Sequence, residues 1–329
     1  MTLKEKFKST LKSSETEDWL DYRVVRPLSY LWALLFARLD IHPNTVTIMS
    51  MFIGAGSCLF FAHGCYYYEG TYGLLMNAIA IALLLWADIF DCTDGQLARM
   101  TGKKSQMGRI LDGAAGFAWF IPIYLALVYR FYVHHDIEFG WFGIADTEQN
   151  ALLTTAVVFI LALISGFLGM GAQQRLADYY IQIHLFFLKG EKGSELDSSA
   201  KQQQIYDNTP WEGNRTWKWF LRSYIDYTKK QEKATPQFQN LMAMIRQKYG
   251  SEGNMPEKLR AEVHRNSKAL MGLNAMLTFN FRAGMFFLFC LADIPAFNFV
   301  FEIVAMSLLT LYINHRHEAF CQRIAKTLI

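Results

Sequence analysis

Three aspartates recur at every third position where a long apolar run ends. Asp88, Asp91 and Asp94 follow the run from Leu74 to Ala87, which is long enough to be most of a membrane helix. On a helix, residues three apart lie roughly along one side. Because carboxylates at or near membrane depth are expensive and rarely idle, we interpret this stretch as a functional site rather than as solvated acids beyond a helix end.

A divalent metal ion is the ligand that these acids suit best. Mg²⁺ and Mn²⁺ take oxygen ligands and keep positions open for water or phosphate oxygens. Asp91 and Asp94 can supply two carboxylates from one helix, and Asp112, on the next helix after a tight connection, can supply a third. A cation held there could bridge phosphates and stabilise a leaving group during phosphoryl-type transfer.

The residues that follow the acids favour a phosphate-bearing substrate. Gly95 and Ala98 have little side-chain bulk, so a flat or charged group could approach the backbone. Arg99 then offers a bidentate fork suited to phosphate. Helix packing through small residues would explain Gly95 or Ala98 taken alone. Nothing in the sequence resembles a phosphate-cradling Gly-rich loop or a Ser/His/Asp arrangement.

The composition predicts an all-α, polytopic membrane protein. The 329 residues are 52% hydrophobic, and several apolar runs approach or exceed the length that spans a bilayer. The six expected transmembrane helices run from residues 42–47 to about 64, from 72 through the acidic motif, over 108–131, from 151 to as far as 188, over 268–291 and over 295–313. Residues 27–38 are apolar but too short to cross, which favours an N-terminal interfacial helix.

The distribution of basic residues predicts the orientation of these helices. Nearly all Lys and Arg fall in the N-terminus, the 99–109 connection, residues 189–266 and the C-terminus. The connections at 65–71, 132–150 and 292–294 hold essentially none. By the positive-inside rule, both termini and the acidic motif face the cytoplasm. In a bacterium the protein would then lie in the inner (plasma) membrane.

The chain divides into four predicted segments. These are an N-terminal cytoplasmic or interfacial segment (1–41), the first four spans with the acidic motif (42–188), a cytoplasmic helical insertion (189–266), and the last two spans with a basic tail (267–329). The insertion is charged and Gln-rich but contains several Trp and Tyr residues, which favours short helices over disorder. The five cysteines form no CxxC pair and predict neither a disulfide framework nor a zinc site.

The acidic stretch resembles the signature of the CDP-alcohol phosphotransferase (CDP-alcohol phosphatidyltransferase) family, D-x2-D-G-x2-A-R-x8-G-x3-D-x3-D. The positions that match at the right spacing are Asp91, Asp94, Gly95, Ala98, Arg99, Gly108 and Asp112. The entry to the first span, Pro43-Asn44-x-x-Thr47, is also similar to the family.

The resemblance implies a membrane enzyme of lipid synthesis. Such an enzyme moves a phospho-alcohol or phosphatidyl group from a CDP-linked lipid or alcohol donor to an alcohol or lipid acceptor and releases CMP. The resemblance implies that Mg²⁺ or Mn²⁺ is bound by Asp91, Asp94 and Asp112. It implies that the nucleotide-diphosphate site is lined by Gly95, Ala98, Arg99 and Gly108. A homodimer is also implied, and no nucleic-acid partner is expected.

One position departs from the family. Gly116 stands where the signature has its fourth aspartate. In the family, that aspartate looks like the general base on the acceptor hydroxyl, and it also helps to hold a second metal ion. Three explanations stay open. The protein is weak or inactive; or Asp88, one turn deeper than Asp91, takes over part of the role. Alternatively, the chemistry uses another donor lipid or a phosphorylated acceptor that needs less help from a base.

Basic residues on the late helices suggest a site for an acceptor phosphate. Arg282 lies in the fifth predicted span, where an arginine should face the bundle interior or water. With Arg175 and Arg316 it could form a cluster similar to the one that holds the acceptor phosphate in phosphatidylinositol-phosphate-type relatives. Snorkelling to the interface is the alternative for Arg175 and Arg316. This cluster favours an inositol-type phospholipid or phosphosphingolipid as the product.

The sequence is also compatible with other functions. One is transfer of a phospho-headgroup onto ceramide or a diacylglycerol-like lipid from a non-CDP donor. Another is a catalytically inactive relative that binds a nucleotide-lipid, or that binds partners through residues 189–266. A cation transporter is less favoured, because transport does not need Gly95, Ala98 and Arg99.

Overall fold

The computed structural model describes residues 7, 10–11, 13, 15–16 and 18–328. Every regular element in these residues is a helix, which confirms the predicted all-α class. Within the predicted 1–41 segment, residues 1–6, 8–9, 12, 14 and 17 lie outside the described part of the chain. The short elements are η1 (Asp21–Val25), α4 (Tyr66–Glu69), α7 (Asp136–Phe142), η3 (Glu191–Gly193) and η4 (Glu252–Asn254).

Six helical stretches among the described residues are long and apolar enough to cross a membrane, as predicted. They are α3 (Pro43–Ala62), α5 (Thr71–Thr101), most of α6 (Gln106–Val133), α8 (Glu148–Gly166) continued through η2 (Phe167–Gln173) and α9 (Gln174–Lys189), α13 (Glu257–Ala275) with α14 (Phe279–Leu291), and α15 (Ala296–Phe301) continued through η5 (Glu302–Met306) and α16 (Ser307–Lys326). The fifth stretch is interrupted at residues 276–278, and the sixth extends past the predicted end at Ile313.

The chain forms two compact units. The first contains Met1–Gly171 and Phe279–Ala305, and the second contains Ala172–Thr278 and Met306–Ile329. The last three of the six long helical stretches therefore contribute one part of their length to each unit. The first unit holds the acidic motif, and the second holds the helices between residues 190 and 257.

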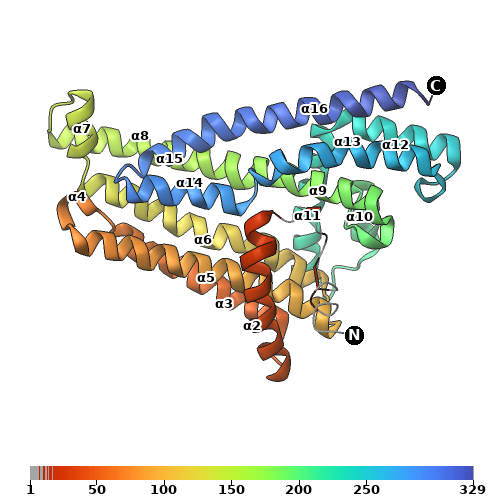
Figure 1. Ribbon diagram of the computed structural model, residues 1–329, viewed down its shortest axis with the longest axis horizontal. Helices are drawn as coiled ribbons and strands as arrows, with labels where there is room; N and C mark the ends of the chain where they lie inside the picture. The colour runs from red at the N-terminus through yellow and green to blue at the C-terminus, as the bar shows by residue number, and fades with distance from the viewer. Residues whose placement is uncertain (1–6, 8–9, 12, 14, 17, 329) are drawn as a thin grey trace. The chain divides into compact units, whose positions relative to one another are not determined.

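Helix α3 packs along both α5 and α6 in the first unit (Figure 1). The ring of Trp119 on α6 occupies the space that a Cβ atom at Gly54 on α3 would need. The indole Nε1 of Trp119 also donates to the Ser50 carbonyl oxygen at 3.0 Å. Small residues let helices in a membrane approach closely and gain packing contacts, so Gly54 sets the close approach of α3 to α6.

A short helix, α2 (Arg26–Arg38), lies against the second span in the same unit. The Ser29 hydroxyl donates to the Ile89 carbonyl oxygen at 2.9 Å, and the Gln96 amide donates to the Arg26 carbonyl oxygen at 3.2 Å. The opposite face of α2 exposes Leu28, Leu31 and Leu35. An exposed apolar face suits an interfacial helix, although its place at the membrane surface stays a prediction.

A buried charge pair joins the ends of several helices at Arg130. The Arg130 guanidinium lies 2.5 Å from the Asp293 carboxylate and donates to the Asn77 side-chain oxygen at 3.1 Å. The same carboxylate accepts from the backbone N–H groups of Tyr66 and Tyr67 at 3.0 and 2.6 Å. Because a buried charge needs a compensating partner, this network fixes the ends of α4, α5, α6 and α14.

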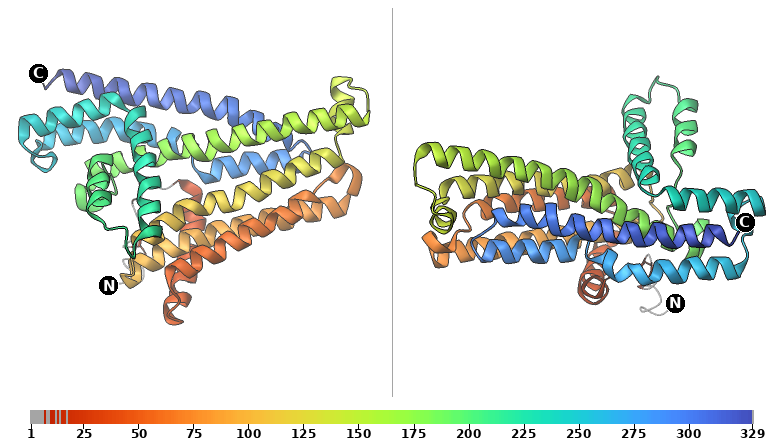
Figure 2. Two further views of the ribbon diagram at one scale, coloured as in Figure 1. Left: turned by 180° about the vertical axis from the view of Figure 1, so that it is seen from behind. Right: turned by 90° about the horizontal axis from the view of Figure 1, so that it is seen from above.

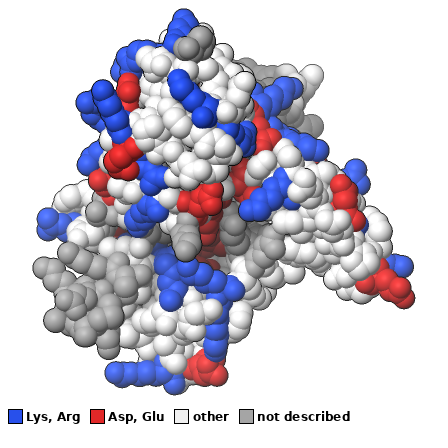
Figure 3. All heavy atoms as spheres, turned by 90° about the vertical axis from the view of Figure 1, so that its right-hand side faces the viewer, with Lys and Arg blue, Asp and Glu red and all other residues white. Residues whose placement is uncertain are grey.

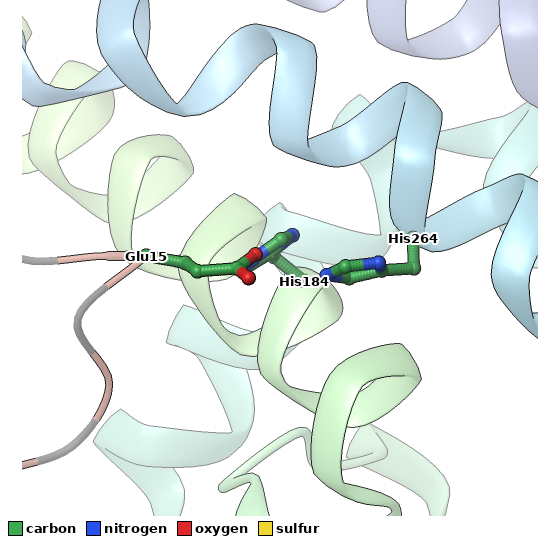
Figure 4. Close-up of side chains that lie close together, drawn as sticks. All are labelled: Glu15, His184 and His264. Carbon is green, nitrogen blue, oxygen red and sulfur yellow. The ribbon is translucent and has the colours of Figure 1, made fainter.

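The second unit contains α9, α10 (Ser199–Asn208), α11 (Arg215–Ala234), α12 (Pro236–Tyr249), α13 and α16. Helices α10 and α11 form a hairpin (Figure 2). Lys218 is buried near the turn of this hairpin, with its ammonium over the rings of Tyr206 and Trp211 at 4.1 and 4.8 Å. The rings of His184 on α9 and His264 on α13 stack at 4.9 Å (Figure 4).

Lys and Arg side chains are numerous on the face shown in Figure 3. The basic residues of α11 that are exposed are Arg215, Arg222, Lys229, Lys230 and Lys233. Basic residues concentrate on the cytoplasmic side of membrane proteins, and the cytoplasmic position of residues 189–266 stays a prediction.

Replacing Asp293 by asparagine is expected to lower the free energy of unfolding by about 3 kcal/mol or more. The change keeps the shape of the side chain but leaves the buried Arg130 guanidinium without its counter-charge. Thermal and denaturant unfolding of the detergent-solubilised protein measure this loss.

Asp40 provides a matched control for this substitution. Like Asp293 it has a positive φ, 51° against 59°, and it pairs with a base, Lys103, at 2.6 Å. Its side chain is 88% exposed, whereas that of Asp293 is 11% exposed. Exposed ion pairs contribute little, so Asp40→Asn is expected to leave the stability unchanged. Equal effects of the two substitutions would contradict the role given to burial.

Candidate metal and nucleotide site

Three carboxylates converge where α5 and α6 meet. Asp91 and Asp94 lie on α5 and Asp112 lies on α6, and one oxygen from each lies within 4.8 Å of the others. The connection between the helices is tight: Gly102 ends α5 in a left-handed conformation, and the Ser105 hydroxyl caps α6 by accepting from the Gly108 N–H at 2.9 Å. This turn brings Asp112 back to the acids of α5.

The environment of the carboxylates suits a cation. Asp94 is buried and Asp91 is half-buried, while Asp112 is exposed. The Asp91 Oδ1 atom is buried and makes no hydrogen bond with any described residue. Burying a polar group without a partner is costly, and like charges placed together add to this cost. Two oxygens bound to one Mg²⁺ lie at most about 4.2 Å apart, so the three acids need only small adjustments to bind one ion.

Thr47 on α3 holds the buried carboxylate in place. Its hydroxyl donates a short hydrogen bond to Asp94 Oδ2. Thr47 itself is buried, and it stands one turn from the start of α3 at Pro43. A partner that orients a ligand carboxylate belongs to the metal site as much as the ligand does. The sequence showed Thr47 only as part of the family-like entry to the first span; its contact with Asp94 joins residues 47 positions apart.

The predicted nucleotide residues gather beside these acids. A Cβ atom at Gly95 would lie 3.3 Å from Nη1 of Arg99, so the guanidinium lies against the glycine. Arg99 Nε donates to the Thr10 carbonyl oxygen at 2.5 Å. Ala98 is half-buried on the same helix. The small residues therefore leave the guanidinium next to the helix backbone, one turn from Asp94.

Gly108 has a structural reason to be glycine. A Cβ atom there would lie 2.8 Å from the Asn44 side-chain oxygen and 3.1 Å from the Ser105 hydroxyl. Gly108 therefore allows the start of α6 to approach the start of α3. Asn44 and Gly108, both part of the family-like pattern, are thus neighbours in the fold.

Asp88 and Gly116 are placed differently from the three converging acids. Asp88 is buried, and its Oδ2 atom has no hydrogen-bond partner in the described chain. It does not belong to the group within 4.8 Å. A Cβ atom at Gly116 would meet no described atom within 4 Å, so the position has room for a side chain.

Arg282 lies in the first unit against a buried acid. Its Nη1 is 3.6 Å from Glu302 Oε1, and both side chains are 5% exposed. Glu302 Oε2 also accepts from Tyr124 at 2.5 Å and from the Ser165 hydroxyl. Sequence reasoning missed Glu302, although an acid inside the sixth span was a visible signal.

The other two predicted arginines lie in the second unit. Arg175 is half-buried on α9, and Arg316 is exposed on α16, where its Nη1 donates to the Tyr312 hydroxyl at 3.0 Å. The acceptor-phosphate cluster of Arg282, Arg175 and Arg316 stays a prediction.

Comparison with known proteins supports the family resemblance. Residues 40–165 match the family model described as CDP-alcohol phosphatidyltransferase, a stretch that contains all three converging acids and Thr47. The match supports a transferase of lipid synthesis that uses a CDP-alcohol, in a family that generally binds Mg²⁺ or Mn²⁺ with acidic residues. Comparison with curated proteins found no match, and neither did comparison with solved structures.

Replacing Thr47 by valine is expected to weaken Mn²⁺ binding roughly 10–100-fold, as loss of an orienting partner does at other metal sites. Valine keeps the volume and removes the hydroxyl that donates to Asp94, whereas Thr47→Ser keeps the hydroxyl and should bind nearly as well as the unchanged protein. Electron paramagnetic resonance of free and bound Mn²⁺ measures the affinity.

Thr45, exposed on the same helix, supplies the matched control. Thr45→Val is expected to leave Mn²⁺ affinity unchanged. Identical affinities for Thr47→Val and Thr45→Val would contradict the positioning role of Thr47.

Proposed function

We propose that this protein transfers a phospho-alcohol or phosphatidyl group from a CDP-linked donor to an alcohol acceptor, with release of CMP. The observation that carries the proposal is the convergence of Asp91, Asp94 and Asp112 from two helices, with a buried Asp91 oxygen that lacks a hydrogen-bond partner in the described chain. Three carboxylates at one point suit a divalent cation that binds phosphate oxygens, and the matched family performs this class of transfer.

The residues around the acids have distinct roles in this proposal. A bound Mg²⁺ or Mn²⁺ would neutralise charge on the donor's diphosphate. Thr47 keeps the Asp94 carboxylate in position, and the Arg99 guanidinium donates to diphosphate oxygens beside Gly95. The acceptor hydroxyl oxygen attacks the phosphorus that carries the transferred group, the bond from that phosphorus to the CMP oxygen breaks, and the hydroxyl proton passes to a base.

The buried arginine at position 282 favours a phosphate-bearing acceptor, and hence an inositol-type phospholipid or phosphosphingolipid product. Its pairing with Glu302 at 3.6 Å offsets part of its charge. Transfer onto ceramide or a diacylglycerol-like lipid from a non-CDP donor is the variant to compare. Lipid mass spectrometry of cells with and without the gene separates these products.

A second candidate function is a non-catalytic relative that binds nucleotide-lipids. The observation that favours it is the glycine at position 116, because the family signature places an acid there. Asp88 does not restore the missing acid within the converging group. The two candidates differ in turnover: the enzyme releases CMP, whereas the binding protein retains affinity for CDP without releasing product.

Replacing Asp91 by asparagine is expected to reduce metal-dependent release of CMP by about 100-fold or more, since metal-assisted charge stabilisation contributes several kcal/mol. Purified protein, a panel of CDP-linked donors and alcohol acceptors, and chromatographic detection of CMP provide the measurement. Asp136→Asn, at an exposed aspartate of α7, is the control and should retain activity. Absence of turnover across the panel with intact CDP binding would instead support the binding protein.

Restoring an acid at position 116 is expected to raise the rate of CMP release at least about tenfold, because a positioned general base typically contributes 10²–10⁴-fold. The space around the Gly116 Cβ position accepts a side chain. Gly113→Asp is the matched control, since its Cβ position is equally open and lies on the same helix. An unchanged or lower rate for Gly116→Asp would show that the missing acid does not limit the reaction.

A further inference from the structure

One turn of α16 brings together three side chains that bind transition metals. His317, Glu318 and Cys321 each place one ligand atom within 4.8 Å of the other two. All three belong to the second unit. We propose that they bind a zinc ion, or a similar borderline divalent cation, at a site separate from the carboxylates of the first unit.

The distances from His317 Nδ1 to the other two ligand atoms are close to those of a tetrahedral zinc site. With zinc bonds of about 2.05 Å to nitrogen, 2.1 Å to oxygen and 2.3 Å to sulfur, a tetrahedron has edges of roughly 3.4 Å between nitrogen and oxygen and 3.6 Å between nitrogen and sulfur. His317 Nδ1 lies 3.3 Å from Glu318 Oε1 and 3.9 Å from Cys321 Sγ. Both separations agree with these edges to about 0.3 Å.

The histidine is held so that Nδ1 faces the other two ligands. Its ring is 2% exposed and packs against the rings of Tyr180, Phe320 and Phe238 at 4.7, 4.8 and 5.8 Å. In the described part of the chain, the only polar contacts of this imidazole are those of Nδ1 with Glu318 and Cys321. The aromatic packing therefore orients the ring.

The Glu318 carboxylate is positioned by a hydrogen bond from another helix. Glu318 Oε2 accepts from the backbone N–H of Gln237, at the start of α12, at 2.6 Å. This leaves Oε1 directed at the histidine. A hydrogen bond to the free oxygen of a ligand carboxylate is a usual feature of protein metal sites. A metal bound here would link α16 to the packing of α9 and α12.

The ligand set selects a different metal from the carboxylate site. A thiolate and an imidazole suit zinc, whereas Mg²⁺ and Mn²⁺ prefer oxygen ligands. Binding requires the Cys321 thiol to lose its proton to water, so the site should release one proton per ion and weaken at low pH. With three protein ligands, the fourth position of the tetrahedron is left to water.

Cobalt titration of the full-length, chelator-treated protein in detergent tests the proposal, because a thiolate bound to Co²⁺ gives a charge-transfer absorption that carboxylates cannot produce. We expect this absorption to saturate at one Co²⁺ per chain and to disappear on addition of Zn²⁺. It should be absent in Cys321→Ser, and the Co²⁺ affinity should fall at least about tenfold in His317→Gln, as for other lost metal contacts.

Two controls separate this site from the carboxylates and from misfolding. Cys92→Ser, next to Asp91, should keep the absorption, and so should His315→Gln, at an exposed histidine of the same helix. Zn²⁺ should raise the unfolding temperature of the unchanged protein but not that of a folded Cys321→Ser variant. No charge-transfer absorption in the unchanged protein, or an absorption that survives in Cys321→Ser, would overturn the proposal.

Discussion

The structure depends on the cost of burying charge in a membrane protein. Among the described side chains of the first unit, two arginines are buried and each faces a carboxylate: Arg130 meets Asp293 and Arg282 meets Glu302. The acids at the junction of α5 and α6 follow the opposite arrangement, because Asp91, Asp94 and Asp112 place like charges together. Without a cation this arrangement is unfavourable, so a cation is the simplest physical reason for it.

The packing of the first unit is organised to deliver that arrangement. Gly54 and Gly108 let α3 approach α6 closely, and Thr47 on α3 contacts the Asp94 carboxylate on α5. The short turn after Gly102 returns the chain so that Asp112 faces the acids of α5. Outside this region, the buried pairs Arg130–Asp293 and Arg282–Glu302 place opposite charges together. The convergence of three carboxylates from two helices is what distinguishes the candidate site.

Much of this could be predicted from the sequence because the signals are local. Hydrophobic length located the six spans, and the spacing of Asp91, Asp94 and Asp112 located the candidate metal site. The interruption at residues 276–278 and the continuation of α16 past Ile313 were not predicted. A hydropathy profile averages over a window, so a short break in a helix is not detected. It also gives no sign that a helix continues beyond its apolar part.

Contacts between residues far apart in the sequence were the main feature that the sequence did not predict. Nothing in the local pattern joins Thr47 to Asp94, or Arg282 to Glu302, because these contacts arise only when helices pack. The cysteines form no CxxC pair, so the sequence predicted no zinc site, yet Cys321 lies one helical turn from His317. A search for i, i+4 pairs of ligand residues on a helix would have found it.

The central claim is that the three carboxylates bind a divalent cation that contacts the donor's diphosphate. Pulsed electron paramagnetic resonance of the Mn²⁺-loaded protein, with a CDP-linked donor bound, measures this contact directly through the magnetic coupling between Mn²⁺ and phosphorus. We expect a phosphorus coupling that requires the donor and is lost in Asp112→Asn. Bound Mn²⁺ without phosphorus coupling, or coupling that persists in Asp112→Asn, would contradict it.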